Sequence, residues 1–152
     1  MTYLYNYLGE PWNCQKWIRE IAKRFYGTEP GSLSGNDDCG QMSAWYMFNC
    51  LGFYPVAPSS NIYNIGSPCV KGLTVKLSNG KYIKMTTENW SEKNVYIKEM
   101  LVNGKKYTKS CLKYEDIKDG ITVHFIMSDK ANFKRGTKPS DLPPSVSEKG
   151  TT

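Results

Sequence analysis

A short polar segment between two glycines holds the residues of this chain that could do chemistry. It runs Gly35-Asn36-Asp37-Asp38-Cys39-Gly40-Gln41, and a strongly apolar stretch follows it. If that stretch is a helix, its free N–H groups and the positive end of its dipole favour an ionised carboxylate just ahead of it. An aspartate held there is a poor acid, but it suits a permanently charged base or a metal ligand. Local sequence alone favours a plain helix cap, because Asn and Asp are the commonest caps.

Cysteine chemistry is a second interpretation of the same segment. Cys39 could act as a thiol nucleophile, because thiolates are stabilised at a helix N-terminus. Such a nucleophile needs a base, and His124, the only histidine, falls on a predicted strand in the other half of the chain. The five cysteines also show no CxxC pair and no metal-finger spacing. A cysteine nucleophile is therefore disfavoured.

Two helices are expected to position the polar segment. In residues 13–26, apolar side chains recur every three or four positions and charged residues take the other face, which predicts a half-exposed helix. Asn13 can cap its start, and Gly27 follows its end. Residues 41–51 are apolar around nearly the whole circumference, so that helix must be buried on most sides. Gly52 supplies its C-terminal glycine.

The hydrophobic period changes to two after these helices, which predicts strands. Apolar and polar residues alternate through residues 73–77, and an Asn-Gly turn follows. A three-residue loop over 78–80 pairs Val75 with Ile83, whereas a two-residue loop would place a lysine opposite Val75. Because register follows the apolar face, we expect the longer loop, with Gly80 left-handed.

Further strands are expected at 95–101 and 121–127, in an antiparallel sheet with a second turn at Asn103-Gly104. In the last strand, His124 falls on the face opposite the most apolar residues, so it should point away from the main core. Prolines among Ser, Lys and Thr after residue 128 indicate an irregular tail.

Composition narrows the class of protein. The chain has 152 residues, of which 39% are hydrophobic and 22% are charged, as in a globular domain. The net charge of +6 comes from basic residues spread over several elements instead of one stripe, so no nucleic acid partner is expected. No apolar run approaches the ~20 residues of a membrane span, and the first residues lack the features of a signal peptide. We expect no membrane partner and no leader in this sequence.

The apolar helix at 41–51 presents a packing problem. The other helical pieces are 13–26 and a fragment at 3–7, and together they cannot enclose it. Either the helices pack on the strands alone, or this chain is the end of something larger.

The polar segment and its surroundings resemble the signature of glycoside hydrolase family 92, which comprises calcium-dependent exo-acting α-mannosidases. The resemblance covers almost the whole chain. Its residues are Gly35-Asn36-Asp37-Asp38-Cys39-Gly40-Gln41-Met42-Ser43-Ala44-Trp45-Tyr46 and Leu51-Gly52-Phe53-Tyr54-Pro55-Val56, with supporting matches at Tyr3-Leu4-Tyr5-Asn6-Tyr7, Pro11-Trp12, Ile65-Gly66-Ser67-Pro68 and Lys138-Pro139-Ser140-Asp141-Leu142-Pro143-Pro144-Ser145.

The resemblance implies an N-terminal β-sandwich, an (α/α)6 toroid holding the site, and cleavage of terminal α-linked mannose with inversion. It places the general base on Asp38, with Asp37 as a secondary candidate. Asn36 and Gln41 become candidates for orienting water, sugar hydroxyls or a calcium ligand. The general acid glutamate and most calcium ligands are expected upstream, so this sequence contains no general acid.

The resulting expectation is an α+β chain that is incomplete without an upstream part. Residues 1–58 would be closing helices of the toroid, 59–130 a small antiparallel β region, and 131–152 an irregular Pro-containing tail. The complete enzyme would be an α-1,2-mannosidase type that trims glycoprotein glycans and is secreted, periplasmic or lumenal, and this chain alone would be inactive. The alternative is a non-catalytic module that binds carbohydrate through exposed aromatic rings, of which Trp12 and Trp90 are the expected ones.

Overall fold

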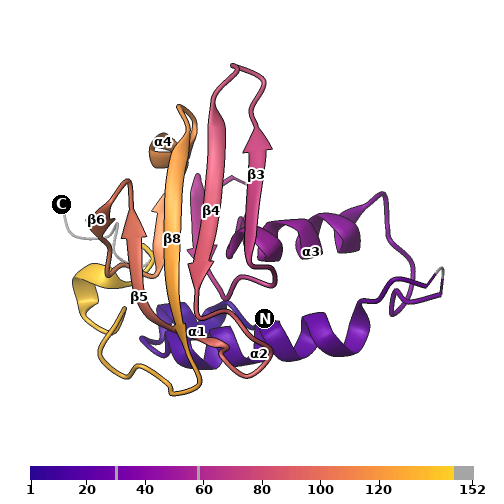
Figure 1. Cartoon of the computed structure of the whole chain (residues 1–152), viewed down its shortest axis with the longest axis horizontal. Coiled ribbons are helices and arrows are strands. Elements are labelled where there is room, and N and C mark those ends of the chain that lie inside the picture. The colour runs from indigo at the N-terminus through magenta and orange to yellow at the C-terminus, as the bar shows by residue number, and fades with distance from the viewer. Residues whose placement is uncertain (30, 58, 146–152) are drawn as a thin grey trace.

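The computed structural model describes residues 1–29, 31–57 and 59–145. Three helices come first, namely α1 (Leu4–Tyr7), α2 (Pro11–Phe25) and α3 (Gln41–Leu51). In Figure 1, α1 and α2 run along the bottom of the molecule and α3 lies above α2. The two main helices expected from the sequence are therefore confirmed.

The start of α2 differs from the expectation. The helix begins at Pro11, and Glu10 is its N-cap, so Asn13 lies inside the first turn. Proline suits the first helical position because its fixed φ is already helical and its missing N–H would be unpaired there. Asn13 instead donates its side-chain amide to the Glu10 carboxylate at 2.8 Å.

Within the described residues, eight strands form two sheets. The smaller sheet is antiparallel, in the order β1-β2-β7. Its strands are β1 (Phe53–Tyr54), β2 (Ile62–Ile65) and β7 (Cys111–Lys113). The larger sheet has the order β3-β4-β8-β5-β6. Its strands are β3 (Gly72–Lys76), β4 (Tyr82–Glu88), β5 (Tyr96–Val102), β6 (Lys105–Lys106) and β8 (Ile121–Ser128). The short helix α4 (Tyr114–Ile117) precedes β8, and a 3-10 turn, η1, spans Pro139–Asp141.

The expectation of a purely antiparallel β region is wrong at one strand pair. Strand β8 lies parallel to β4, with Ile83 opposite Ile121 and Glu88 opposite Ile126, and it separates β4 from β5. Strands β4 and β5 follow each other along the chain but do not pair, because β8, which comes later in the chain, lies between them. Alternation of apolar residues fixes the faces of a strand but not its direction, so the pattern could not reveal this pairing.

The β3–β4 hairpin follows the expected register. Val75 pairs with Ile83, and the Leu77 N–H donates to the Lys81 carbonyl at 2.8 Å. This leaves residues 78–80 as the loop, with Gly80 at φ 80°. The prediction of a three-residue loop with a left-handed glycine is confirmed.

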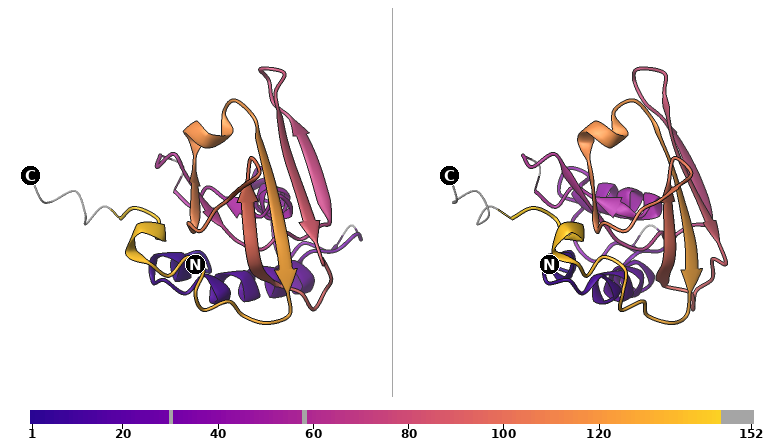
Figure 2. Two further views of the ribbon diagram at one scale, coloured as in Figure 1. Left: turned by 60° about the vertical axis from the view of Figure 1, so that its left-hand side comes forward. Right: turned by 90° about the vertical axis from the view of Figure 1, so that its left-hand side faces the viewer.

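The main core lies on the inner face of the larger sheet. Its most buried large side chains include Ile97, Met100, Phe125 and Met127, and residues of β1, β2 and β7 join them. Figure 2 shows α3 and α4 on one side of this sheet, with α1 and α2 across its lower end. His124 lies on the opposite face and bonds the Thr86 hydroxyl at 2.8 Å, as expected for a residue outside the main core.

The segment after β8 is irregular, but some of its side chains are buried. Arg135 is buried, and its guanidinium donates to the carbonyls of Tyr107 (3.4 Å) and Lys109 (3.0 Å). Burial lowers the pKa of Arg135 to about 10, so this side chain stays charged at neutral pH. Buried Asp141 accepts the Thr108 hydroxyl at 2.8 Å. The last residues of the expected tail, 146–152, lie outside the described part of the chain.

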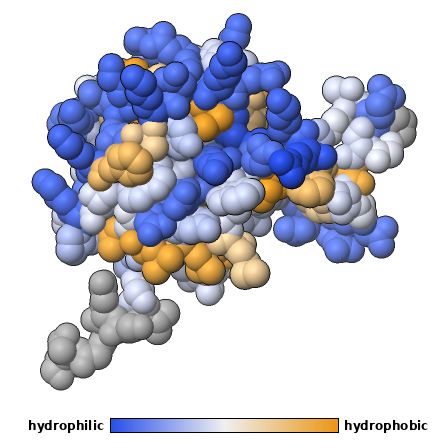
Figure 3. All heavy atoms as spheres, turned by 90° about the horizontal axis from the view of Figure 1, so that it is seen from below, coloured by the Kyte–Doolittle hydropathy of each residue, from blue (hydrophilic) through white to orange (hydrophobic). Residues whose placement is uncertain are grey.

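Apolar side chains are exposed on α3 and on the lower face of the molecule. On α3, Ala44 and Met47 face solvent, so the helix expected to be buried is open along part of its length. A second group gathers on the lower face (Figure 3), where Met1, Leu4 and Leu8 are exposed beside α2. No helix in the described ranges is long and apolar enough to cross a membrane.

Candidate active site

The loop before α3 has an unusual backbone that separates its two aspartates. Asp38, Cys39 and Gly40 all have positive φ, at 44°, 62° and 89°. A left-handed backbone is unfavourable for residues with a Cβ, although Asp adopts it more readily than most. Three such residues in succession turn the chain sharply into the first turn of α3. The side chains of Asp37 and Asp38 therefore meet different surroundings.

The Asp37 carboxylate caps the first turn of α3. Its Oδ1 accepts the Ser43 N–H at 2.9 Å and its Oδ2 accepts the Ser43 hydroxyl at 2.8 Å. The Asp37 carbonyl also accepts the N–H groups of Gly40 at 3.0 Å and Gln41 at 2.8 Å. These bonds satisfy N–H groups that a helix start leaves free. Because the Ser43 N–H and hydroxyl stabilise the anion, the pKa of Asp37 lies below its ordinary value.

Asp38 is exposed, and its side chain makes no hydrogen bond or ion pair within the described residues. From the sequence, the N–H groups at the start of α3 were expected to hold the Asp38 carboxylate. They bind Asp37 instead, and the Asp38 carboxylate faces solvent.

The other candidates in the loop are also exposed. Asn36, Cys39 and Gln41 face solvent, and the Gln41 backbone rather than its side chain bonds Asp37. His124 lies on β8 in the outer face of the sheet, bonded to Thr86, so it is not paired with Cys39. The structure thus brings Asn36, Asp38 and Gln41 to one exposed loop, with polar groups free toward solvent.

Helix α3 is anchored from below by a buried asparagine. Asn49 accepts a hydrogen bond from the Tyr3 hydroxyl and donates to the Trp45 carbonyl at 2.7 Å. Its own carbonyl accepts the N–H groups of Gly52 and Cys69 at 3.0 and 3.3 Å. These bonds join the C-terminal end of α3 to Tyr3 and to the chain after β2.

Two features of the site were not anticipated from the sequence. Ser43 is the partner of Asp37, and Tyr26 stacks on Trp45 and Tyr46 with ring centroids 5.3 and 5.0 Å apart. The pKa of Tyr26 is raised, mainly by burial and further by the negative charge of Asp37. The sequence gives a weak indication of the Ser43 contact, because a hydroxyl two residues into a helix often bonds a group at the helix start. The ring stack could not be predicted, because it depends on tertiary contact.

The two tryptophans expected to be exposed are half-buried. Trp12 lies within α2, not in a loop, and packs edge-on against Phe133 with centroids 4.9 Å apart. Trp90 packs under the Arg19 guanidinium, 5.1 Å from its ring centroid. Trp17 is more exposed than either.

No group of three or more His, Cys, Asp or Glu side chains that could hold a metal ion occurs in the described ranges. A calcium ion takes six to eight oxygen ligands. The exposed loop could offer part of such a shell through Asn36, Asp38 and Gln41, but it does not form a complete site.

Known proteins resemble this chain over most of its length. Residues 1–129 match the glycosyl hydrolase family 92 catalytic domain. An uncharacterized secreted glycosidase from Arthroderma benhamiae is 33% identical over 149 residues, which cover 95% of this chain and 19% of that protein.

Solved structures give closer similarity. A family GH92 α-mannosidase from Bacteroides thetaiotaomicron, in complex with mannoimidazole, is 68% identical with a TM-score of 0.94, over 95% of this chain and 19% of that one. A GH92 inverting mannosidase from Bacteroides thetaiotaomicron VPI-5482 is 37% identical with a TM-score of 0.89, over 96% of this chain and 20% of that one. The chain therefore spans about a fifth of the length of these relatives. On the match over residues 1–129, it belongs to glycoside hydrolase family 92.

Proposed function

We propose that this chain is the C-terminal part of an inverting exo-acting α-mannosidase and that Asp38 is its general base. The two solved relatives are both named mannosidases, and one is named inverting. The observation that carries the proposal is the contrast between adjacent carboxylates: Asp37 is bound to Ser43, whereas Asp38 has no side-chain partner within the described residues. A solvent-facing carboxylate with no partner among the described residues can take a proton from a water molecule.

In the proposed reaction, Asp38 accepts a proton from a water that attacks the anomeric carbon opposite the leaving group. A carboxyl group on the other side of the sugar protonates the leaving oxygen. Inverting glycosidases hold these two groups ~6.5–9.5 Å apart, which leaves room for the water. Asp38 suits the role of the base because its carboxylate is exposed and has no partner in the part of the chain that the structure describes.

Asp37 is unsuited to serve as the matching acid. It lies next to Asp38 on the same loop, so the two cannot flank a sugar from opposite faces. Its bonds to Ser43 also stabilise the anion and lower its pKa, whereas a general acid must hold its proton at working pH. The acid is therefore proposed to lie in the part of the enzyme outside this chain, as are the helices that complete the toroid.

The proposed enzyme uses calcium, as the family resemblance implies. The described residues do not form a complete calcium site, so most ligands would come from outside this chain, and we assign no step to the ion. Terminal mannose of glycoprotein glycans is the proposed substrate, with the α-1,2 linkage as the expected type. An exported location is supported by the relative described as a secreted glycosidase.

The test is hydrolysis of an α-mannoside by a complete enzyme that contains this sequence, followed by NMR of the anomeric proton. Inversion predicts that β-mannose appears first and that the α-anomer grows only by mutarotation. Initial release of α-mannose would show retention and would contradict the proposed pair of carboxyls. The 152-residue chain alone is expected to give no turnover, because it lacks the acid.

A further inference from the structure

An apolar groove lies between helix α3, strand β3 and the short helix α4, and its volume is about 470 Å³. Most of its lining consists of aliphatic and aromatic side chains, among them Met47, Leu51, Leu73, Val75 and Tyr114. Among the described residues, the only charged side chain in the lining is that of Lys118, which pairs with Glu115. The groove is therefore an apolar surface that is open to solvent.

The inner face of the larger sheet loses its cover at β3, which forms one wall of the groove. On the neighbouring strand β4, the side chains of Ile83 and Met85 are only 6% and 1% exposed. Their partners across the hairpin, Val75 and Leu73, lie on the same face but are only half-buried. An apolar face that continues from buried to half-exposed residues is typical of a surface on which a further layer packs.

Helix α3 forms the opposite wall, and α4 closes one end. Met47 is 56% exposed, and Ala44, one turn earlier on α3, is exposed as well. Tyr114 of α4 is 46% exposed. The side-chain amide of Asn79, in the β3–β4 loop, donates to the Lys118 carbonyl at 2.7 Å. The hairpin and the end of α4 are thus joined by the chain's own contacts, so an occupant would meet a surface that is already formed.

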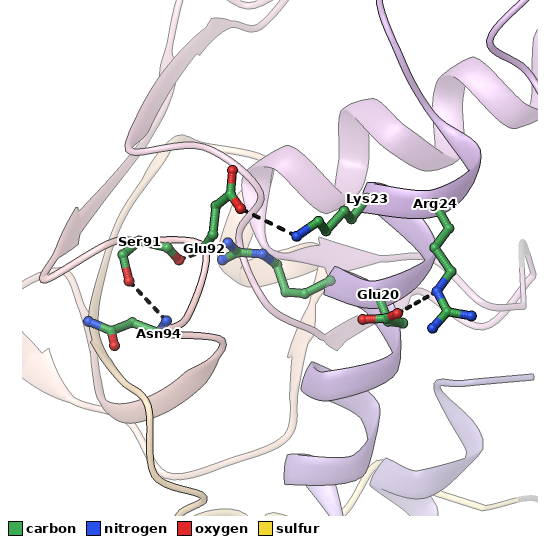
Figure 4. A network of polar contacts seen from close by, with 7 residues as sticks. Glu20, Lys23, Arg24, Ser91, Glu92 and Asn94 are labelled. Carbon is green, nitrogen blue, oxygen red and sulfur yellow. Dashed lines mark hydrogen bonds and ion pairs between the residues drawn. The ribbon is translucent and has the colours of Figure 1, made fainter.

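The surface around α2 has a different chemistry. Figure 4 shows Lys23 of α2 and Glu92 of the loop between β4 and β5, which form an ion pair of 3.4 Å. Glu20 and Arg24 pair with each other along the same helix. Exposed ion pairs keep their charges hydrated, so that surface is satisfied by water. The groove offers apolar walls instead, so apolar side chains would be stabilised there, whereas a charged or hydroxyl-rich ligand would lose its hydration without replacement.

The length of the relatives identifies a source for such side chains. This chain spans about a fifth of the length of the relatives that it matches, so most of each relative lies outside the matched region. A segment of the same polypeptide would reach the groove at a high effective concentration, whereas a second copy would have to bind from solution. The occupant that the groove favours is thus a part of the same molecule.

We infer that this groove is filled by apolar side chains from the part of the enzyme outside this chain. The inference rests on the proposed function, in which that part also supplies the general acid. Asp38 lies in the loop directly before α3, and α3 itself forms a wall of the groove. Contact in the groove would therefore hold the acid-bearing part in place relative to Asp38. An inverting glycosidase needs such support, because its two carboxyls must stay ~6.5–9.5 Å apart.

The test uses a complete enzyme that contains this sequence, with a photoreactive diazirine residue in place of Met47. Irradiation should join position 47 to a peptide outside residues 1–152 of the same molecule, which mass spectrometry then identifies. The same residue in place of Thr74, which is exposed on the other face of β3, should give no product with that peptide. A product that joins two copies, a product confined to residues 1–152, or no product at all would overturn the inference.

Oxidation by hydroxyl radicals provides a second measurement, on the unaltered enzyme, that does not depend on the folding of the photoreactive variant. The Met47 sulfur should be oxidised in the 152-residue chain, at a concentration where it is monomeric, and should lose this oxidation in the complete enzyme. Tyr82, which is 46% exposed on the outer face of β4, should be modified in both. Equal oxidation of Met47 in both proteins would overturn the inference, and equal protection of Met47 and Tyr82 would count against it as general shielding.

Neither measurement depends on turnover. A complete enzyme that cleaves no α-mannoside but cross-links as expected would contradict the proposed function and leave the filled groove in place. An active, inverting enzyme whose Met47 stays open to oxidation would do the reverse. Failure of the groove and failure of the proposed function are therefore distinguishable.

Discussion

The Asp37 carboxylate binds Ser43 with both of its oxygens, at 2.9 Å to the N–H and 2.8 Å to the hydroxyl. This contact decides how two adjacent aspartates divide their roles. It commits Asp37 to holding the start of α3 and leaves the neighbouring carboxylate of Asp38 toward solvent. The division depends on the left-handed backbone of Asp38, Cys39 and Gly40, which turns the two side chains apart.

The first prediction concerns pH. The pKa of Asp37 is lowered by the Ser43 N–H and then by the Ser43 hydroxyl, so its ionised form stabilises the folded chain. That stabilisation is fully present above the unfolded value of ~3.9 and is lost as pH falls through the lower, folded value. Ser43→Ala should therefore reduce the loss of stability on acidification. Urea unfolding between about pH 6 and about pH 3 measures this.

Ser34→Ala is the control for this experiment. Ser34 lies in the same loop region, is exposed, and makes no side-chain bond within the described ranges. It should leave the pH dependence unchanged. An unaltered profile in Ser43→Ala would show that the Ser43 hydroxyl, the part of the contact that this variant removes, does not lower the pKa of Asp37.

The second prediction compares two left-handed glycines. A Cβ at Gly52 would lie 2.8 Å from the Phe125 ring, whereas one at Gly80 would have no heavy atom within 4 Å. In both alanine variants the left-handed backbone should lower the free energy of unfolding by about 1–2 kcal/mol. Gly52→Ala should lower it clearly further, because Phe125 is fully buried and cannot move aside. Denaturant unfolding of both variants gives the difference, and equal losses would contradict the close packing of α3 on the sheet.

The third prediction is that the 152-residue chain associates with itself through its exposed apolar residues. Large contiguous apolar patches seldom stay solvated. Leu8 is 70% exposed on the lower face and Met47 is 56% exposed on α3. Leu8→Lys and Met47→Lys should each shift sedimentation toward monomer, and Thr74→Lys on the exposed face of β3 should not. A wild-type chain that is monomeric at high concentration would be evidence against unfilled contact surfaces.

Local sequence patterns predicted those parts of the fold that contacts between near neighbours in the chain determine. The register of the β3–β4 hairpin followed from apolar alternation, because only one loop length keeps Val75 and Ile83 on the same face. The presence of α2 followed from helical periodicity, although it begins at Pro11 and not at the predicted Asn13. The extent of α3 followed from periodicity and from Gly52. Glycines and carboxylates directly before an apolar helix marked residues 35–41 as a candidate site, which stays a prediction.

Other features depend on contacts between distant segments and could not be predicted in this way. The parallel pairing of β8 with β4 requires a strand from late in the chain to separate two earlier ones. Buried Arg135 lies in a Pro-containing segment whose composition suggested an irregular tail. In the site, the N–H groups of α3 bind Asp37 and not Asp38 because the backbone of Asp38, Cys39 and Gly40 has positive φ. Residues with a Cβ seldom adopt this conformation, so the sequence did not predict it.

The central claim is that Asp38 acts as the base and Asp37 as a cap, and steady-state kinetics on a complete enzyme containing this sequence test it most directly. Asp38→Asn removes the base but keeps the size of the side chain, so kcat should fall by roughly 10²–10⁴-fold with little change in the thermal melt. Asp37→Asn should cost far less activity, because its amide can accept the Ser43 N–H and donate to the Ser43 hydroxyl. Loss of turnover in Asp37→Asn with near-normal turnover in Asp38→Asn would contradict the account and move the base to Asp37.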